Sequence, residues 1–460
     1  MYNLKFITLI YFILSSIILF SQDFKKDSTL IRSIYTEALS NGKAYDDLYN
    51  LTKNIGQRLS GSLGAEMAVQ WGEQTLKKYD FDKVYLQKVM VPLWKRGTHE
   101  RGFYISKTND IQQITILALG GSVGTNGILK APLVMVNSLE ELKNANTDIY
   151  KGKIIFLAEA MDANVPTAFE AYGKGFGVRY SAAVEAAKQG AVGVIIRTLS
   201  LSENDFPNTG IMKYEDGVAK IPAAAISTND ATLLKKRIEA GEQFTFAMEM
   251  DCQQLPDVES YNVIGEITGS KYPNRIISVG GHLDSWDVGE GAHDDGTGIV
   301  HSMEALRILK TIGYKPQNTI RVVFFMNEEN GNKGGHTYAE KAIENNEEHI
   351  FAIESDAGGF SPRGFEFSKA RDIDFITQFK HLFAPYQLAE FIPGGGGVDI
   401  SPLGKKFENI GLIGFLPDSQ RYFDIHHNNN DVFENVNKRE LHLGCASIAS
   451  LIYLLDKYSN

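Results

Sequence analysis

The sequence of 460 residues is poor in cysteine and has no cluster of basic side chains. Cys252 and Cys445 allow one disulfide at most, and buried free thiols are the simpler interpretation because a chain of this length can build a core without disulfides. The formal net charge is −10. Without a basic block, we expect no binding to nucleic acid or to an anionic membrane surface.

Long apolar runs are also missing after the N-terminus. The segment from Phe6 to Phe20 is mostly apolar and follows Lys5, but it is too short for a comfortable membrane span. It is typical of a signal peptide, so we expect residues 1–21 to be removed on export to the periplasm or the medium. An uncleaved anchor is the alternative, and we expect no stable membrane span after signal removal.

The remainder of the chain divides into three segments with different periodicity. Residues 22–109 show helical spacing and then one strand, and residues 110–250 contain short strands with one clear helix at 181–191. Residues 251–460 alternate strands, at 274–282, 319–327, 349–356 and 409–416, with helices. This alternation predicts an α/β fold with a mostly parallel sheet and helices on both faces, into which residues 110–250 are inserted as a β-rich module.

Imidazole and carboxylate side chains lie at the end of each of these predicted strands or after it. They are His282 and Asp284, Glu328 and Glu329, Asp356, and His426, His427 and Asp431, while Asp294 and Asp295 precede a predicted helix. Ligands bind at the carboxyl ends of parallel strands, so we expect these groups to lie together. Carboxylates gathered in this way repel one another unless a cation neutralises them. Histidine and carboxylate without cysteine favour a pair of zinc ions over a structural zinc.

These motifs resemble the co-catalytic di-zinc exopeptidases, a family that includes bacterial leucyl aminopeptidases and glutamate carboxypeptidase II. The resemblance extends from about Tyr261 to the C-terminus, and "GGGGVDISPL" and "YFDIHHNNND" are most similar to the carboxypeptidase Q branch. The inserted module resembles a protease-associated domain through "KGKIIFLAEA", "AAKQGAVGVIIRT" and "IPAAAISTND". The resemblance implies a zinc-dependent hydrolase of dipeptides or short peptides that forms a homodimer.

The resemblance also implies a role for individual residues. The implied ligands of two zinc ions are His282, Asp294, Glu329, Asp356 and His427. Asp294 matches the bridging carboxylate, joined to Asp295 by a cis peptide bond, and Asp284 matches the acid that orients His282. Glu328 matches the general base, which takes a proton from water and passes it to the leaving amine.

One position departs from the glutamate carboxypeptidase II pattern. The residue before the last histidine ligand is a tyrosine there and donates to the oxyanion, whereas here it is His426. We expect the imidazole N–H of His426 to take over that donation. The alternatives are that His426 only packs beside the site, or that it exchanges roles with His427.

Other functions remain open from the sequence. A receptor or binding protein on the same scaffold and a glutaminyl cyclase-like enzyme with one zinc are the alternatives to a peptidase. The terminus that the enzyme recognises is open too. Arg363 is the cation nearest to a predicted ligand in the sequence, but it also fits a surface loop. Asp399 and Ser401 could line the pocket, or Asp399 could cap a turn.

Overall fold

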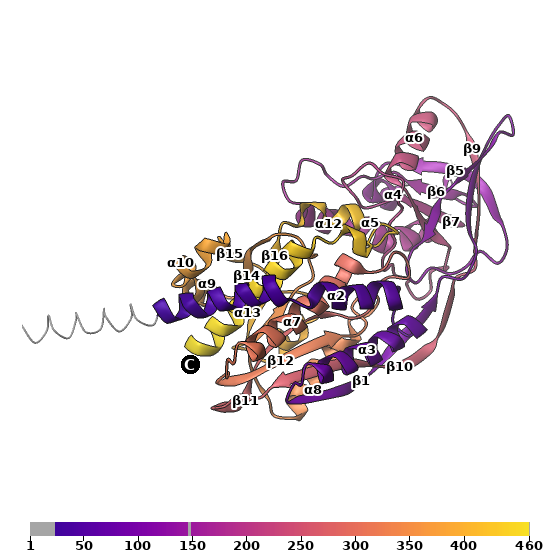
Figure 1. Ribbon diagram of the computed structural model, residues 1–460. Coiled ribbons are helices and arrows are strands. Elements are labelled where there is room, and N and C mark those ends of the chain that lie inside the picture. Colours follow the sequence, from indigo (N-terminus) through magenta and orange to yellow (C-terminus); the bar gives the residue numbers. More distant parts are fainter. Residues whose placement is uncertain (1–23, 146–148, 460) are drawn as a thin grey trace, which may run out of the picture.

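The computed structural model describes residues 24–145 and 149–459 (Figure 1). The expected signal peptide, residues 1–21, lies outside these residues. Within the described ranges, no helix combines the length and the apolar composition that a membrane span requires.

Two sheets of eight strands each organise the described part of the chain. In the first sheet the order is β1 (Lys83–Lys95), β10 (Gln253–Ile267), β12 (Asn318–Phe325), β11 (Tyr272–His282), β13 (Glu348–Glu354), β16 (Gly411–Pro417), β14 (Pro362–Phe367) and β15 (Glu390–Pro393). The four strands from β12 to β16 are parallel, but the pairs β1–β10, β10–β12 and β14–β16 are antiparallel. The prediction of a mostly parallel sheet is therefore wrong, because the sheet is mixed.

Short connections account for the mixed order. Parallel neighbours need a crossover of a dozen or more residues, whereas a short connection reverses the chain direction. β10 ends at Ile267 and β11 starts at Tyr272, so the two strands run in opposite directions. β13 ends at Glu354 and β14 starts at Pro362, again without a helix between them. The alternation that predicts a parallel sheet holds only for the central strands.

Helices cover both faces of the first sheet (Figure 1). In β12, Val322 and Phe324 belong to the apolar core on one face, and Val323 and Phe325 belong to the core on the other. The first core includes residues of α3 (Leu63–Lys78), α7 (Thr297–Thr311) and α13 (Lys438–Tyr458). The second includes residues of α8 (Lys333–Glu344) and α11 (Ser401–Lys406). Further helical segments are 24–41, α2 (Ala44–Tyr49), η1 (Asn50–Ile55), α9 (Ala370–Thr377), α10 (Lys380–Phe383) and α12 (Tyr422–Ile425).

The second sheet lies within residues 100–250, which we call the inserted unit. Its strands lie in the order β3 (Ile111–Ile114), β2 (Glu100–Ser106), β9 (Phe244–Met250), β5 (Leu129–Val136), β6 (Ile154–Leu157), β7 (Gly193–Arg197), β8 (Ala223–Ile226) and β4 (Ile116–Ala118). The chain enters this unit after β1 and leaves it before β10, and these two long strands pair with each other. The sheet thus starts at Glu100, earlier than the boundary at residue 110. The assignment of the unit to the protease-associated domains stays a prediction.

The inserted unit contains more helix than the sequence pattern indicates. Its helices are α4 (Leu139–Asn144), α5 (Ala168–Lys188) and α6 (Thr228–Glu239). The sequence predicts a helix only at 181–191, whereas α5 begins at Ala168. Gly173, Gly175 and Gly177 lie in the first half of α5 and weaken the local helical signal, because glycine has a low helix propensity. Tertiary packing of α5 overrides that preference.

Candidate metal centre

The predicted ligands come together at the carboxyl edge of the first sheet. β11 ends at His282, and Glu328 and Glu329 follow the end of β12. Asp356 follows β13, and Asp294 precedes α7. His427 belongs to the segment that follows α12. The parallel direction of the central strands explains why residues from distant parts of the chain meet at one edge.

Asp294 lies between two imidazoles. Its Oδ1 is 3.2 Å from Nε2 of His282, and its Oδ2 is 3.1 Å from Nε2 of His427. His282 Nε2 also lies 3.6 Å from Oδ1 of Asp356, and His427 Nε2 lies 3.0 Å from Oε2 of Glu329. The two carboxylate oxygens of Asp294 therefore face two adjacent groups, each of which contains one histidine and one further acid.

The donor set fits divalent metal ions. Potential ligand atoms lie within 4.8 Å of one another in three overlapping groups, which are Asp294 with His426 and His427, His282 with Asp295 and Asp356, and His282 with Asp294 and Glu329. Oε1 of Glu329 is buried and has no hydrogen-bond partner. Imidazole and carboxylate ligands without thiolate suit zinc, and a carboxylate between two such groups suits two ions close together.

The electrostatics show an excess of negative charge. Burial raises the pKa of Glu329 to about 7, and it also raises the pKa values of Glu328 and Asp356. Burial alone would lower the pKa of His427, but the carboxylates of Glu329 and Asp294 raise it to about 9. His282 behaves in the same way, because burial opposes its charge and the carboxylate of Asp356 favours it, so its pKa is raised. A site of this kind is complementary to cations.

The carboxylate of Asp295 accepts hydrogen bonds from backbone amides, which distinguishes it from the carboxylate of Asp294. Its Oδ2 accepts a hydrogen bond from the amide of His282 at 3.0 Å, and its Oδ1 accepts one from the amide of Gly298 at 2.9 Å. The peptide bond between Asp294 and Asp295 is cis. Of the two neighbours, Asp294 is the one whose carboxylate faces both histidines.

Asp284 lies closer to the imidazole of His282 with its backbone carbonyl than with its carboxylate. Its carboxylate Oδ1 is 4.0 Å from Nδ1 of His282, whereas the backbone carbonyl of the same residue is 2.9 Å from that nitrogen. The carboxylate instead accepts hydrogen bonds from the amides of Asn327 at 2.7 Å and Glu328 at 3.1 Å, and from the hydroxyl of Ser60 at 2.9 Å. Asp284 thus fixes the turn that carries the two glutamates, while its carbonyl faces the imidazole.

His426 lies directly on His427. The two rings stack with centroids 3.4 Å apart, and Nε2 of His426 is 3.5 Å from Oδ2 of Asp294. Nδ1 of His426 is buried without a hydrogen-bond partner. His427 makes the shorter contact with Asp294, at 3.1 Å, and its Nε2 also lies 3.0 Å from Glu329. This geometry favours His427 as the ligand and leaves His426 beside it.

The structure adds two residues to those expected at the site. The Tyr422 hydroxyl donates to Oδ1 of Asp356 at 3.3 Å, and Tyr422 begins the short helix α12, which ends just before His426. Arg58 is fully buried and donates to the backbone carbonyls of Leu283, Glu290 and Gly291, so it holds the loop after β11. The spacing of Tyr422 was a usable signal, but nothing local marks Arg58.

The residues suggested for substrate recognition lie in three different environments. Arg363 is paired with Asp418 at 2.8 Å and is partly exposed. Both carboxylate oxygens of Asp399 are buried without hydrogen-bond partners, and burial together with the carboxylate of Glu354 raises its pKa. The hydroxyl of Ser401 donates to the carbonyl of Val398 at 2.9 Å. Arg363 lies in β14 and not in a loop, and its guanidinium is engaged by Asp418.

Comparison with known proteins places this arrangement in context. A family model described as Peptidase family M28 matches residues 262–451. Carboxypeptidase Q of Homo sapiens is 35% identical over 420 residues, which cover 90% of this chain and 85% of the relative. The crystal structure of a Peptidase M28 precursor from Shewanella amazonensis SB2B matches with a TM-score of 0.90 and 32% identity, covering 95% of this chain and 98% of that chain. BSAP, a zinc aminopeptidase from Bacillus subtilis, shares the fold with a TM-score of 0.64 and 20% identity, covering 90% of this chain and 95% of that chain.

Proposed function

The chain belongs to peptidase family M28 and is a metallo-exopeptidase, and from that premise we propose that it hydrolyses dipeptides or short peptides near a free terminus with two zinc ions per chain. The observation that carries this proposal is the position of Asp294, whose two carboxylate oxygens lie 3.2 Å and 3.1 Å from two different imidazoles. A single ion would not require both oxygens to face separate histidines.

The residues divide between two ions. His282 and Asp356 would hold one, Glu329 and His427 would hold the other, and Asp294 would contribute one oxygen to each. When bound, such a pair of zinc ions lowers the pKa of a water molecule and polarises the carbonyl of the scissile peptide bond.

Glu328 is the proposed general base and acid. Its amide is fixed by the carboxylate of Asp284, and its neighbour Glu329 contacts His427, so its backbone is held at the rim of the site. Its side chain is only half-buried, whereas Glu329 is buried. In this position the Glu328 carboxylate takes a proton from the attacking water and delivers it to the leaving amine.

His426 is the proposed donor to the oxyanion. Its ring is held against His427 and its pKa is lowered by burial and by the His427 imidazole, so it donates as a neutral imidazole. The hydroxyl of Tyr422 is a second donor in the same site, 3.3 Å from Asp356. Both side chains are nine-tenths or more buried, which places them in the low-dielectric surroundings where such donors are effective.

Export and assembly stay predictions. The proposed signal peptide, residues 1–21, would direct the chain to the periplasm or the medium, and the homodimer rests on the resemblance alone. Light scattering at working concentration tests the dimer, and N-terminal sequencing of the exported protein tests removal of the signal peptide.

Metal counting and substrate mapping test the function. We expect elemental analysis of zinc-saturated protein to approach two ions per chain. One ion would favour the glutaminyl cyclase-like alternative, and activity that persists in metal-free protein would refute the proposal. A dipeptide library with free and blocked termini identifies which terminus is required, and full hydrolysis of peptides blocked at both ends would exclude an exopeptidase.

A further inference from the structure

One short segment of the inserted unit, Asn208–Gly210, forms hydrogen bonds with the loop that carries His426 and His427. The amide of Thr209 donates to the carbonyl of His427 at 2.9 Å, and the carbonyl of Thr209 lies 3.3 Å from Nδ1 of His427. A carbonyl oxygen can only accept, so this contact requires the proton of His427 to be on Nδ1. In the neutral imidazole that binds a metal ion, Nε2, which faces Asp294 and Glu329, then carries the lone pair.

The inserted unit holds this segment firmly from its own side. Thr209 is fully buried, and its hydroxyl donates to the carbonyl of Ala118 at 2.7 Å. Nη1 of Arg179, from α5, donates to the carbonyl of Thr209 at 3.3 Å. From outside the inserted unit, Nη2 of Arg96 donates to the hydroxyl of Thr209 at 3.3 Å. A side chain at Gly210 would meet Arg179 at 2.3 Å, so the segment fits closely against α5.

The same segment also fixes the backbone on either side of His427. Nδ2 of Asn208 donates to the carbonyl of His426 at 2.6 Å, and Oδ1 of Asn208 accepts from Nδ2 of Asn428 at 3.3 Å. His427 has a φ of 61°, which is unfavourable for a residue with a side chain. A conformation of this kind persists only where the surroundings impose it, and three consecutive residues are held here by Asn208 and Thr209.

The two histidines of the centre therefore depend on different parts of the molecule. Nδ1 of His282 faces the carbonyl of Asp284, two residues away in the first sheet's own loop. Nδ1 of His427 faces a carbonyl of the inserted unit, 218 positions away in the sequence. Loss of the contacts made by the inserted unit should affect one imidazole and spare the other.

We propose that Asn208–Gly210 positions the imidazole of His427 for metal binding, so that the inserted unit completes one of the two zinc sites. This inference rests on the proposed function, because it assumes that His427 is a ligand. Asn208 and Thr209 are positioning residues and touch neither metal nor substrate. Groups that orient a ligating histidine in this way affect metal affinity by about 10- to 100-fold.

The test compares the affinities of the two zinc ions in full-length variants. Asn208→Leu keeps the approximate size of the side chain and removes the N–H that donates to the carbonyl of His426. Asn208→Asp also removes this donor but keeps the side chain polar. Competition with a chromophoric chelator should show one zinc bound as in the wild type and one bound about 10- to 100-fold more weakly. Ser227→Ala is the matched control, because Ser227 is equally buried and caps α6 of the same unit. It should lose stability but bind both ions normally.

The outcomes separate this inference from the proposed function. If the wild type binds two ions and the Asn208 variants bind both with unchanged affinity, the positioning role is wrong and the proposed function stands. Equal weakening of both ions in the Asn208 variants, or selective weakening of one ion in Ser227→Ala, would also overturn it, since each indicates a general loss of structure. A wild type that binds fewer than two ions would refute the proposed function itself. If Asn208→Leu does not fold, Asn208→Asp provides the measurement.

Discussion

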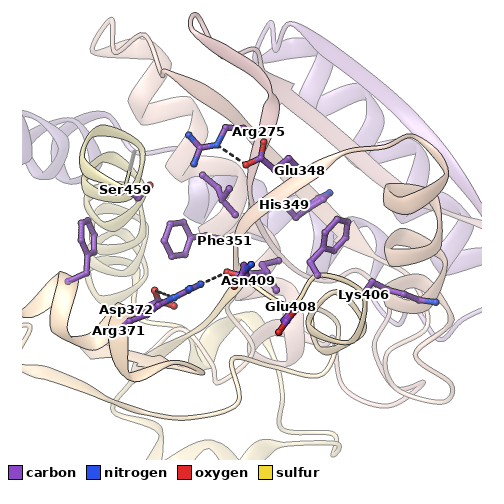
Figure 2. A pocket seen from close by; sticks show the side chains of 14 residues that line it. Arg275, Glu348, His349, Phe351, Arg371, Asp372, Lys406, Glu408, Asn409 and Ser459 are labelled. Carbon is purple, nitrogen blue, oxygen red and sulfur yellow. Dashed lines mark hydrogen bonds and ion pairs between the residues drawn. The ribbon is translucent and has the colours of Figure 1, made fainter.

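The strands of the first sheet carry charged side chains at both ends, and the two ends differ in how those charges are balanced. At the amino edge, a cavity of about 720 Å³ lies among Arg275, Glu348, Arg371 and Asp372, and Figure 2 shows these side chains in pairs. The ion pairs Arg275–Glu348 and Arg371–Asp372 measure 3.2 Å and 3.5 Å. At the carboxyl edge, the acids of the metal centre face imidazoles and one another.

The contrast is sharpest along β12 and the turn that follows it. Arg321 lies within the strand and pairs with Glu266 at 2.7 Å and with Glu347 at 2.8 Å. Burial would raise the pKa of Glu347, but hydrogen bonds from His349 and Arg321 lower it to about 2. Glu329 follows the same strand, and burial raises its pKa to about 7. One acid is stabilised as an anion by the protein, and the other is not.

The difference separates charges that support the fold from charges that serve a ligand. Removing one partner of a buried acid–arginine pair destabilises the fold whether or not a metal ion is present. Buried acids that lack such a partner cost free energy unless a metal ion is bound. Neutralising a carboxylate at the amino edge should therefore lower stability, whereas neutralising Glu328 at the carboxyl edge should lower the rate of catalysis. Removing metal should lower stability through the carboxyl edge alone.

Neutralising Glu328 should have the largest effect on rate. We expect Glu328→Gln to lower kcat by about 10⁴-fold, the upper end of the range for general acid–base catalysis. The variant should bind zinc, because the proposed ligands are unchanged, and it should unfold at a temperature close to that of the wild type. Steady-state kinetics and calorimetry measure the two quantities. Near-normal turnover would remove Glu328 as the base.

Removing metal should be the largest perturbation of stability. At free zinc 1,000-fold above its Kd, the bound ion stabilises the fold by about 4 kcal/mol, and chelation removes this contribution. Thermal unfolding of wild-type protein with and without chelator measures it. Asp294→Asn is the control, since it loses the carboxylate that faces both imidazoles and should respond little to the chelator. If the unfolding temperature of the wild type does not change in chelator, the acids at the carboxyl edge do not need a bound metal ion, and the proposed difference between the two edges is wrong.

Removing the oxyanion donor should have a smaller effect on rate. We expect His426→Ala to lower kcat by roughly 10²–10³, the scale for one such donor, and to retain both metals. Tyr422→Phe, which removes the other hydroxyl of the site, is the comparison variant. If Tyr422→Phe shows this loss and His426→Ala does not, Tyr422 is the donor. If His426→Ala loses metal while His427→Ala keeps it, the assignment of the ligand is reversed.

Neutralising Glu347 should reduce stability and leave the rate nearly unchanged. The pKa of this group is about 2 in the folded chain against an ordinary value of 4.5, so Glu347→Gln should cost about 3 kcal/mol near neutral pH. Because the folded-state pKa is depressed, the stabilisation is complete above about pH 4.5 and is lost as the pH falls toward 2. Urea unfolding of metal-free protein from pH 7 to pH 3 should show the wild type and variant converging.

Glu344→Gln is the matched control for this prediction. Glu344 pairs with Lys341 on the exposed side of α8, and surface pairs contribute little. A pH-independent difference between Glu347→Gln and the wild type would show that the Arg321 pair does not set the stability.

Residue type and position after a strand were enough to predict which side chains could form the centre. His282 ends a largely apolar β-strand, Glu329 and Asp356 follow two others, and parallel neighbours bring their carboxyl ends to one edge of the sheet. The helices on both faces followed from the periodicity as well. The mixed order of the sheet did not, because it depends on short connections such as the one between Ile267 and Tyr272.

The sequence by itself thus determined the family, the α/β class and the set of candidate ligands, since local patterns of polarity and spacing indicate all three. Only the tertiary structure decided what holds the ligands. Arg58 reaches the loop after β11 from 225 positions away, and Thr209 reaches His427 from 218 positions away. Both act through backbone carbonyls, which every residue possesses. A contact with a backbone carbonyl does not require a particular residue type at that position, so it cannot be inferred from the sequence and is seen only in the folded chain.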